Sequence, residues 1–201
     1  MTEIGLLAGS GWAAGLNLWS VGLVLGIAGR LDLATTPEVF ERWWVILVFG
    51  VLYVFEFFVD KIPLIDSAWD IVSTIIRPVG AALIGLAIAR DGDMSWVTGV
   101  LTSGGFALTS HGAKAAVRAL INMSPEPFSN WIASVTEDGA AVGMSSMALA
   151  NPAAAAVLAL IFGGFAVLTV VVLWRFLRRI RRRILERYRR GWRATAASPT
   201  S

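Results

Sequence analysis

Long apolar stretches separated by short polar segments make up most of the chain. A helix needs roughly 20 mostly apolar residues to cross a bilayer. Six stretches approach that length: Ile4–Ala28, Trp43–Val59, Ser67–Ala89, Ser95–Asn122, Phe128–Ala150 and Ala153–Trp174. The pattern therefore predicts an all-α polytopic integral membrane protein with about six transmembrane helices.

Composition supports the membrane prediction and excludes several kinds of site. Charged residues make up 15% of the chain and the mean hydropathy is +0.69, whereas soluble domains average about 25% charged residues. The chain has no Cys and one His, His111, so we expect neither a metal site nor a cofactor. Glu3 stands where a signal peptide carries Lys or Arg, so the first stretch is predicted to be a retained span.

A faint internal repeat divides the membrane domain, residues 1–174, into halves of about 4–90 and 95–174. Gly11–Asn17 matches Gly105–His111, and Pro63 matches Pro152. Three spans per half would place the halves in opposite orientations, as in many secondary transporters. Chance matching is the competing explanation.

Small residues leave a second span count open. The glycines of the first stretch permit a helix break near Asn17, which gives five spans plus a re-entrant segment as the alternative. Gly9-Ser10-Gly11 and Ser103-Gly104-Gly105 suggest broken helices at corresponding places in the two halves. Alternatively they only let helices pack closely.

A basic tail follows the last apolar stretch. Ten of the seventeen Lys and Arg residues lie between Arg175 and Arg193, and the excess of positive charge predicts a cytoplasmic C-terminus for residues 175–201. Apolar residues are interleaved, so the tail is predicted to bind anionic lipid headgroups rather than nucleic acid. The candidate lipid-binding residues are Arg178, Arg179, Arg181, Arg182 and Arg183.

Charged residues also occur inside the apolar stretches, where ionised groups are costly and commonly functional. On a helix, Asp70 and Arg77 share one face, as do His111, Lys114 and Arg118. We expect these two faces to be partners. The candidate ion or substrate pathway comprises Asn17, Glu56, Asp60, Asp66, Asp70, Arg77, His111, Lys114, Arg118, Glu137 and Asp138.

Two interpretations of these charges remain open. In the first, the carboxylates form a cation or proton path, and a protonated His111 offsets part of their negative charge. In the second, the outer members lie near the headgroups and their cations extend outward. The second interpretation applies to Asp60, Lys61, Asp66 and Arg118.

Several of these segments together resemble a known family. Asp60–Asp70 (DKIPLIDSAWD), Arg77-Pro78, Leu101–Ala119 and Glu137-Asp138-Gly139 are similar to the uncharacterised bacterial membrane-protein family called domain of unknown function 4126. The resemblance covers about Gly5 to Val170. It implies a multi-pass helical protein and carries no activity, substrate or cofactor.

The sequence predicts a small transporter or channel for an ion or small polar solute in the bacterial inner membrane, with proton coupling as an option. The alternative is a lipid-handling or scaffold protein whose buried charges are structural. No enzyme is expected, because no nucleophile–base pair is recognisable. The glycine and alanine faces of the first and last helices predict a homo-oligomer.

Overall fold

The computed structural model of the chain describes residues 2–62, 65–121 and 127–196. This part is helical and contains no strand, which confirms the predicted all-α fold for the described residues. The helices are α1 (Thr2–Leu16), α2 (Leu18–Arg30), α3 (Glu38–Glu41), α4 (Trp43–Val59), α5 (Ile65–Asp91), α6 (Trp96–Ile121), α7 (Pro127–Ala150) and α8 (Pro152–Ala196). Pro63, which the predicted repeat matches to Pro152, lies outside the described residues.

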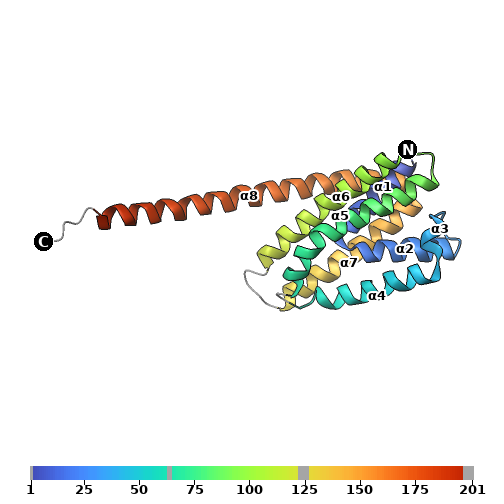
Figure 1. Cartoon of the computed structure of the whole chain (residues 1–201), viewed down its shortest axis with the longest axis horizontal. Helices are drawn as coiled ribbons and strands as arrows, with labels where there is room; N and C mark the ends of the chain where they lie inside the picture. The colour runs from blue at the N-terminus through green and yellow to red at the C-terminus, as the bar shows by residue number, and fades with distance from the viewer. Residues whose placement is uncertain (1, 63–64, 122–126, 197–201) are drawn as a thin grey trace.

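α1 and α2 form a hairpin instead of one continuous helix (Figure 1). Asn17 has an extended backbone, and its side-chain oxygen accepts a hydrogen bond of 3.0 Å from the backbone N–H of Ser20. This is the usual cap of a helix N-terminus. The single span predicted over Ile4–Ala28 is therefore two helices, and the break is the one that the alternative topology allowed near Asn17.

Both ends of this hairpin lie at the same end of the bundle. The start of α1 lies beside the α5–α6 connection, where Glu3 approaches Gly92. The end of α2 lies beside the start of α4, where Gly26 packs against Ile46. Residues near the start of α4 and the end of α5 line one common cleft. Asn17 is therefore the inner tip of the hairpin.

α1 packs closely along α6. Gly11 lies against the backbone of Ser103, and Gly15 lies against Ala107 and Ser110, so that a Cβ atom on either glycine would collide with α6. Both helices are continuous through their glycines. The predicted breaks at Gly9-Ser10-Gly11 and Ser103-Gly104-Gly105 are therefore wrong, and these small residues serve close helix packing.

The repeated segments Gly11–Asn17 and Gly105–His111 belong to helices that run in the same direction. The hydroxyl of Ser103 donates to the carbonyl of Leu7, and further along both helices the hydroxyl of Ser110 donates to the carbonyl of Trp12. Inverted halves would orient the matched helices oppositely. The contact does not support an inverted repeat, because small residues recur wherever two helices share a close interface.

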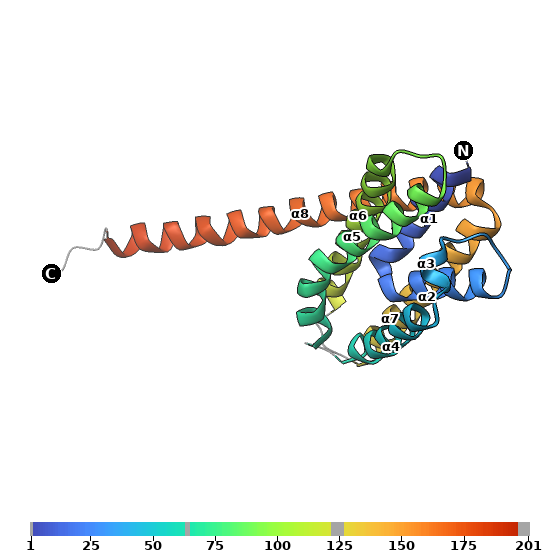
Figure 2. The same ribbon diagram turned by 45° about the vertical axis from the view of Figure 1, so that its right-hand side comes forward.

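α8 is much longer than its predicted apolar span. It packs on α1, α6 and α7 in its first part and then projects beyond the bundle as one continuous helix (Figures 1 and 2). The predicted apolar span Ala153–Trp174 forms its first part, and the basic tail continues the same helix, because Arg and Leu favour helix and no Pro interrupts the segment after Pro152. The last part of the predicted tail, residues 197–201, lies outside the described residues.

The outer surface carries many large apolar side chains. Two helical segments, Ala68–Asp91 and Pro152–Arg183, are long and apolar enough to cross a membrane. Trp44, Ile75 and Leu160 are each more than half exposed. Extended apolar surface of this kind marks contact with a membrane or a partner. The structure therefore supports association of this chain with a membrane.

Candidate functional site

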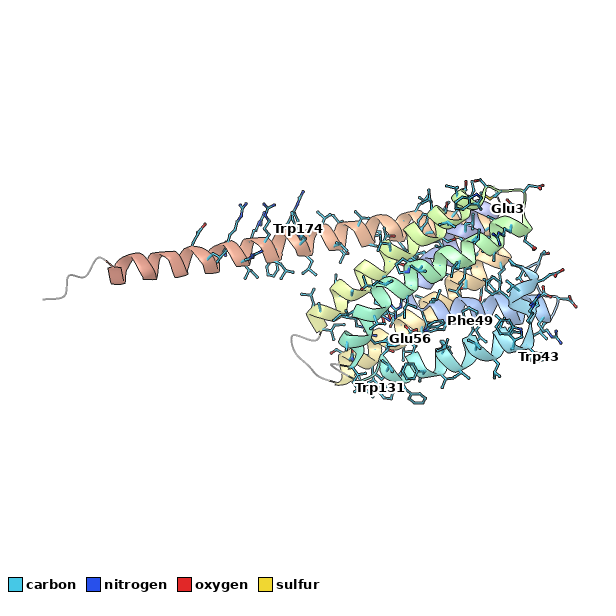
Figure 3. All side chains as sticks on the ribbon, viewed as in Figure 1. Glu3, Trp43, Phe49, Glu56, Trp131 and Trp174 are labelled. Carbon is cyan, nitrogen blue, oxygen red and sulfur yellow. The ribbon has the colours of Figure 1, made fainter. Side chains whose placement is uncertain are left out.

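A buried group of charged side chains lies between α4, α5, α6 and α7, beside the Asn17 break between α1 and α2. We call these residues the charged cluster: Glu56, Asp60, Lys61, Asp70, Arg77, Lys114, Arg118, Glu137 and Asp138. All but Glu137 are at most 6% exposed. Glu56 points into the bundle, whereas Trp43 and Trp131 point outward (Figure 3).

The helix break at Asn17 supplies both an amide and free carbonyl groups to the cluster. The side-chain N–H of Asn17 donates to Asp138 over 2.9 Å. Because α1 ends there, its last carbonyls lack helical partners. Arg77 donates to the carbonyl of Gly15 and Lys114 donates to that of Leu16, each over 3.2 Å. These cations also match the negative end of the α1 dipole.

Arg77 connects three helices at the centre of the cluster. Its guanidinium forms an ion pair with Glu56 on α4 and lies 3.8 Å from Asp70 on its own helix. It also donates to Nδ1 of His111 on α6 over 3.0 Å. This nitrogen is therefore an acceptor, since guanidinium only donates.

The hydrogen-bond chain around His111 fixes the charge of its imidazole. With Nδ1 accepting from Arg77, the proton lies on Nε2, which donates to Thr74 Oγ1 over 3.1 Å. The Thr74 hydroxyl then donates to the carbonyl of Asp70. His111 is neutral in this arrangement, so it does not offset the carboxylates as the protonated form was expected to.

A second group of ion pairs surrounds Lys114 and Arg118 on α6. Lys114 Nζ lies 2.7 Å from Asp60 and 3.3 Å from Glu137. Arg118 pairs with Glu137 at 2.7 Å and donates to the side-chain oxygen of Asn130 and to the backbone carbonyl of Asp60. These contacts join the end of α4 to α6 and α7.

Lys61 links the same region to the helix hairpin. Its ammonium donates to the Phe57 carbonyl and the Ser134 hydroxyl, lies over the Phe57 ring and is 4.0 Å from Asp138. Lys61 is 6% exposed, while Asp60 and Arg118 are each 1% exposed. Of the two interpretations left open for these residues, the one that places them near the headgroups does not hold for these three, because each finds opposite charge inside the bundle.

The structure gathers almost every predicted pathway residue but changes the expected pairing. We expected the acidic face carrying Asp70 to meet the basic face carrying Lys114. The two faces do meet, because Thr74 and Arg77 on α5 bond to His111 on α6. Lys114, however, pairs with Asp60, and Asp70 lies nearest to Arg77. The side chain of Asp66 lies outside the described part of the structure.

Sequence reasoning missed several neutral partners. Asn130, Ser134 and Asp138 lie four residues apart on α7, which is one helical face, and Asn130 and Ser134 bond to Arg118 and Lys61. That spacing was a usable signal. The backbone carbonyls of Gly15 and Leu16 left no such signal in the sequence.

The remaining candidates lie elsewhere. The tail residues Arg178, Arg179, Arg181, Arg182 and Arg183 are exposed on α8 beyond the bundle, with the Arg178 guanidinium over the ring of Trp174. Within the described ranges, no group of three His, Asp or Glu side chains could hold a metal ion.

Comparison with known proteins places the chain in a family. The model of the family described as Domain of unknown function (DUF4126) matches residues 4–175. The chain belongs to the DUF4126 family. The match covers every residue of the charged cluster and stops at the start of the basic tail, which agrees with the predicted resemblance. No curated protein and no solved structure matches the chain.

Proposed function

We propose that this DUF4126 protein is a membrane transporter or channel that moves an ion or a small polar solute through the charged cluster. The main support for this proposal is that the charged cluster around the Asn17 break contains five carboxylates but only four cationic side chains. Buried ionisable groups in a bundle that contacts lipid are costly and are retained mainly for function.

The excess carboxylate is the proposed proton carrier. Among the described contacts, one side-chain oxygen each of Glu56, Asp60 and Asp70 accepts no hydrogen bond. Buried carboxylate oxygens without donors favour protonation or a bound cation. Asp138 also has such an oxygen, but its other oxygen accepts a hydrogen bond from Asn17. Asp70 is the best candidate, because its closest cation, Arg77, is 3.8 Å away and already pairs with Glu56.

The proposed topology has five spans, α4 to α8, with the α1–α2 hairpin as a re-entrant segment. The hairpin places a helix C-terminus and a helix N-terminus at the cluster, as in transporters with discontinuous helices. The proposed location is a bacterial inner membrane with the C-terminus in the cytoplasm, which the excess of positive charge in the tail supports. We propose that the exposed arginines of the tail contact anionic lipid headgroups.

The second candidate function is a scaffold whose charges hold the bundle together. It is favoured by the close pairing of Arg77 with Glu56, Lys114 with Asp60 and Arg118 with Glu137. Such pairs, when broken, destabilise strongly without any role in transport.

Proton flux in proteoliposomes separates these functions. A trapped pH dye would report flux driven by a K⁺ diffusion potential for the wild-type chain, Asp70→Asn and the control Asp93→Asn, which changes an exposed loop carboxylate. We expect flux in the wild type and control and its loss in Asp70→Asn, with unchanged thermal unfolding. A wild-type rate equal to that of empty liposomes would reject the proton pathway, and an unaffected Asp70→Asn would reject this site.

A further inference from the structure

A second site lies on the opposite side of α5 from the α1–α6 interface. A cleft of about 900 Å³ runs between α4 and α5, with α2 at its floor. α4 packs mainly on α2, so its outer part stands apart from α5 (Figure 2). The cleft falls within the size range of about 300–1,000 Å³ that is typical of small-molecule sites.

The walls of this cleft are apolar and face outward. Trp44 and Val48 line it from α4, and Ile75, Val79 and Leu83 line it from α5. All five are exposed. Along α5 the cleft extends from Ile75 to Arg90, which is roughly 22 Å of helix. Half of a bilayer core is about 15 Å thick, so the cleft is long enough for an acyl chain of one leaflet.

The outer end of the cleft carries charge of both signs. Arg42 and Arg90 line it together with Glu38 and Asp91. All four are exposed. Within the described part of the chain, neither arginine has a carboxylate within 4 Å, and so both guanidinium groups are available to a ligand. Arginine guanidinium groups form charge-assisted and often bidentate hydrogen bonds with phosphate.

We propose that this cleft binds a zwitterionic membrane phospholipid, with an acyl chain between α4 and α5, its phosphate on Arg42 and Arg90, and its ammonium group near Glu38 and Asp91. The arrangement of an apolar slot with a charged end matches an amphiphile. The basic tail lies at the other end of the bundle, so the proposed cytoplasmic C-terminus puts this lipid in the outer leaflet.

Native mass spectrometry of the full chain in detergent tests the assignment. The probes are phosphatidylethanolamine and a diacylglycerol with the same acyl chains. We expect phosphatidylethanolamine to bind and Arg42→Ala/Arg90→Ala to weaken its binding about tenfold or more, because charge-assisted bonds to phosphate are lost. Diacylglycerol should bind the wild type as weakly as phosphatidylethanolamine binds the double variant. The matched control is Arg178→Ala/Arg182→Ala on the tail, which should retain the lipid.

A second variant tests the slot itself. Ala87 is half-buried in the cleft wall, and Ala87→Trp should fill the cleft and displace the lipid. Val51→Trp, on another face of α4, should not. Thermal unfolding of each variant shows whether it is folded. Equal binding of phosphatidylethanolamine to folded wild type and folded Arg42→Ala/Arg90→Ala would overturn the proposal. A disulfide-linked dimer formed efficiently by Leu83→Cys would overturn it in favour of a second copy. Neither result depends on proton flux, so the transport proposal stands or falls separately.

Discussion

Lys114 on α6 and Asp60 after α4 form an ion pair of 2.7 Å across 54 positions of the chain. Both side chains are 1% exposed. The pair joins the end of α4 to the centre of the bundle, where Lys114 also caps the carbonyl of Leu16. Lys114 thus connects α1 to the end of α4, as Arg77 does through Gly15 and Glu56.

Breaking this pair should destabilise the bundle more than removing it. Lys114→Met removes the 2.7 Å partner of Asp60 and leaves Arg118, at 3.9 Å, as its nearest described cation. Breaking a buried pair in this way costs about 3–5 kcal/mol of unfolding free energy. Adding Asp60→Asn should recover most of that loss. Unfolding in detergent by dodecyl sulfate titration measures both, and a double variant no more stable than Lys114→Met would contradict the pairing.

Asn17→Asp should destabilise the hairpin although Asp is as good a helix cap as Asn. The substituted carboxylate cannot donate to Asp138 and would lie beside it at the present distance of 2.9 Å. We expect a loss of about 1–3 kcal/mol from the unsatisfied, repelling groups. Ser20→Ala, which removes only the hydroxyl bond to the Asn17 carbonyl, is the milder comparison in the same unfolding assay.

The same substitution should have opposite effects at two glycines. A Cβ on Gly11 would meet the backbone of Ser103, whereas a Cβ on Gly139 meets no described atom within 4 Å. Gly11→Ala should therefore lower the unfolding free energy by about 1–3 kcal/mol through overpacking. Gly139→Ala should raise it by about 0.5–1 kcal/mol through helix propensity. Two losses of similar size would argue against the close α1–α6 contact.

Arg77→Lys should not be a conservative change. The guanidinium pairs with Glu56 while donating to the Gly15 carbonyl and His111, and an ammonium group lacks the planar fork needed to reach all three. We expect a lower thermal midpoint in detergent and a loss of flux. Arg175→Lys on the exposed tail is the matched control and should leave both unchanged.

Truncation after Trp174 should leave the bundle intact. The exposed arginines of the tail lie beyond the helices that pack together. The shortened chain should therefore unfold at the same temperature as the full chain. Reconstituted in nanodiscs, the shortened chain should have the same thermal midpoint in anionic and in neutral lipid. The thermal midpoint of the full chain should rise in anionic lipid and fall back when salt is added. A destabilised truncation would show that the tail supports the fold.

Much of the secondary structure was predictable from the sequence. α4 spans the predicted Trp43–Val59, and α7 and α8 meet at the predicted Asn151-Pro152 break, because apolar length and Pro are local signals. The glycines only permitted a break near Asn17, and the capping ability of the Asn17 side chain was a local signal that the prediction of one continuous span did not use. The repeat was misleading because glycine marks close packing as readily as common ancestry.

The candidate site was predictable in membership but not in pairing. Charged residues inside apolar stretches must turn inward. Their positions within those stretches therefore predicted that Glu56, Arg77, Lys114 and Asp138 would lie together. Which acid meets which base depends on helix register across long sequence separations. A hydropathy pattern does not specify it.

The sequence by itself determined that the chain is helical, that it carries a basic end, and that its inner faces hold charge. Only the tertiary structure decided that α1 and α2 turn back at Asn17, that Lys114 meets Asp60, and that α4 stands away from α5. The physical reason is range: capping and hydropathy act within a few residues, whereas ion pairs and clefts form between helices that the chain brings together only on folding.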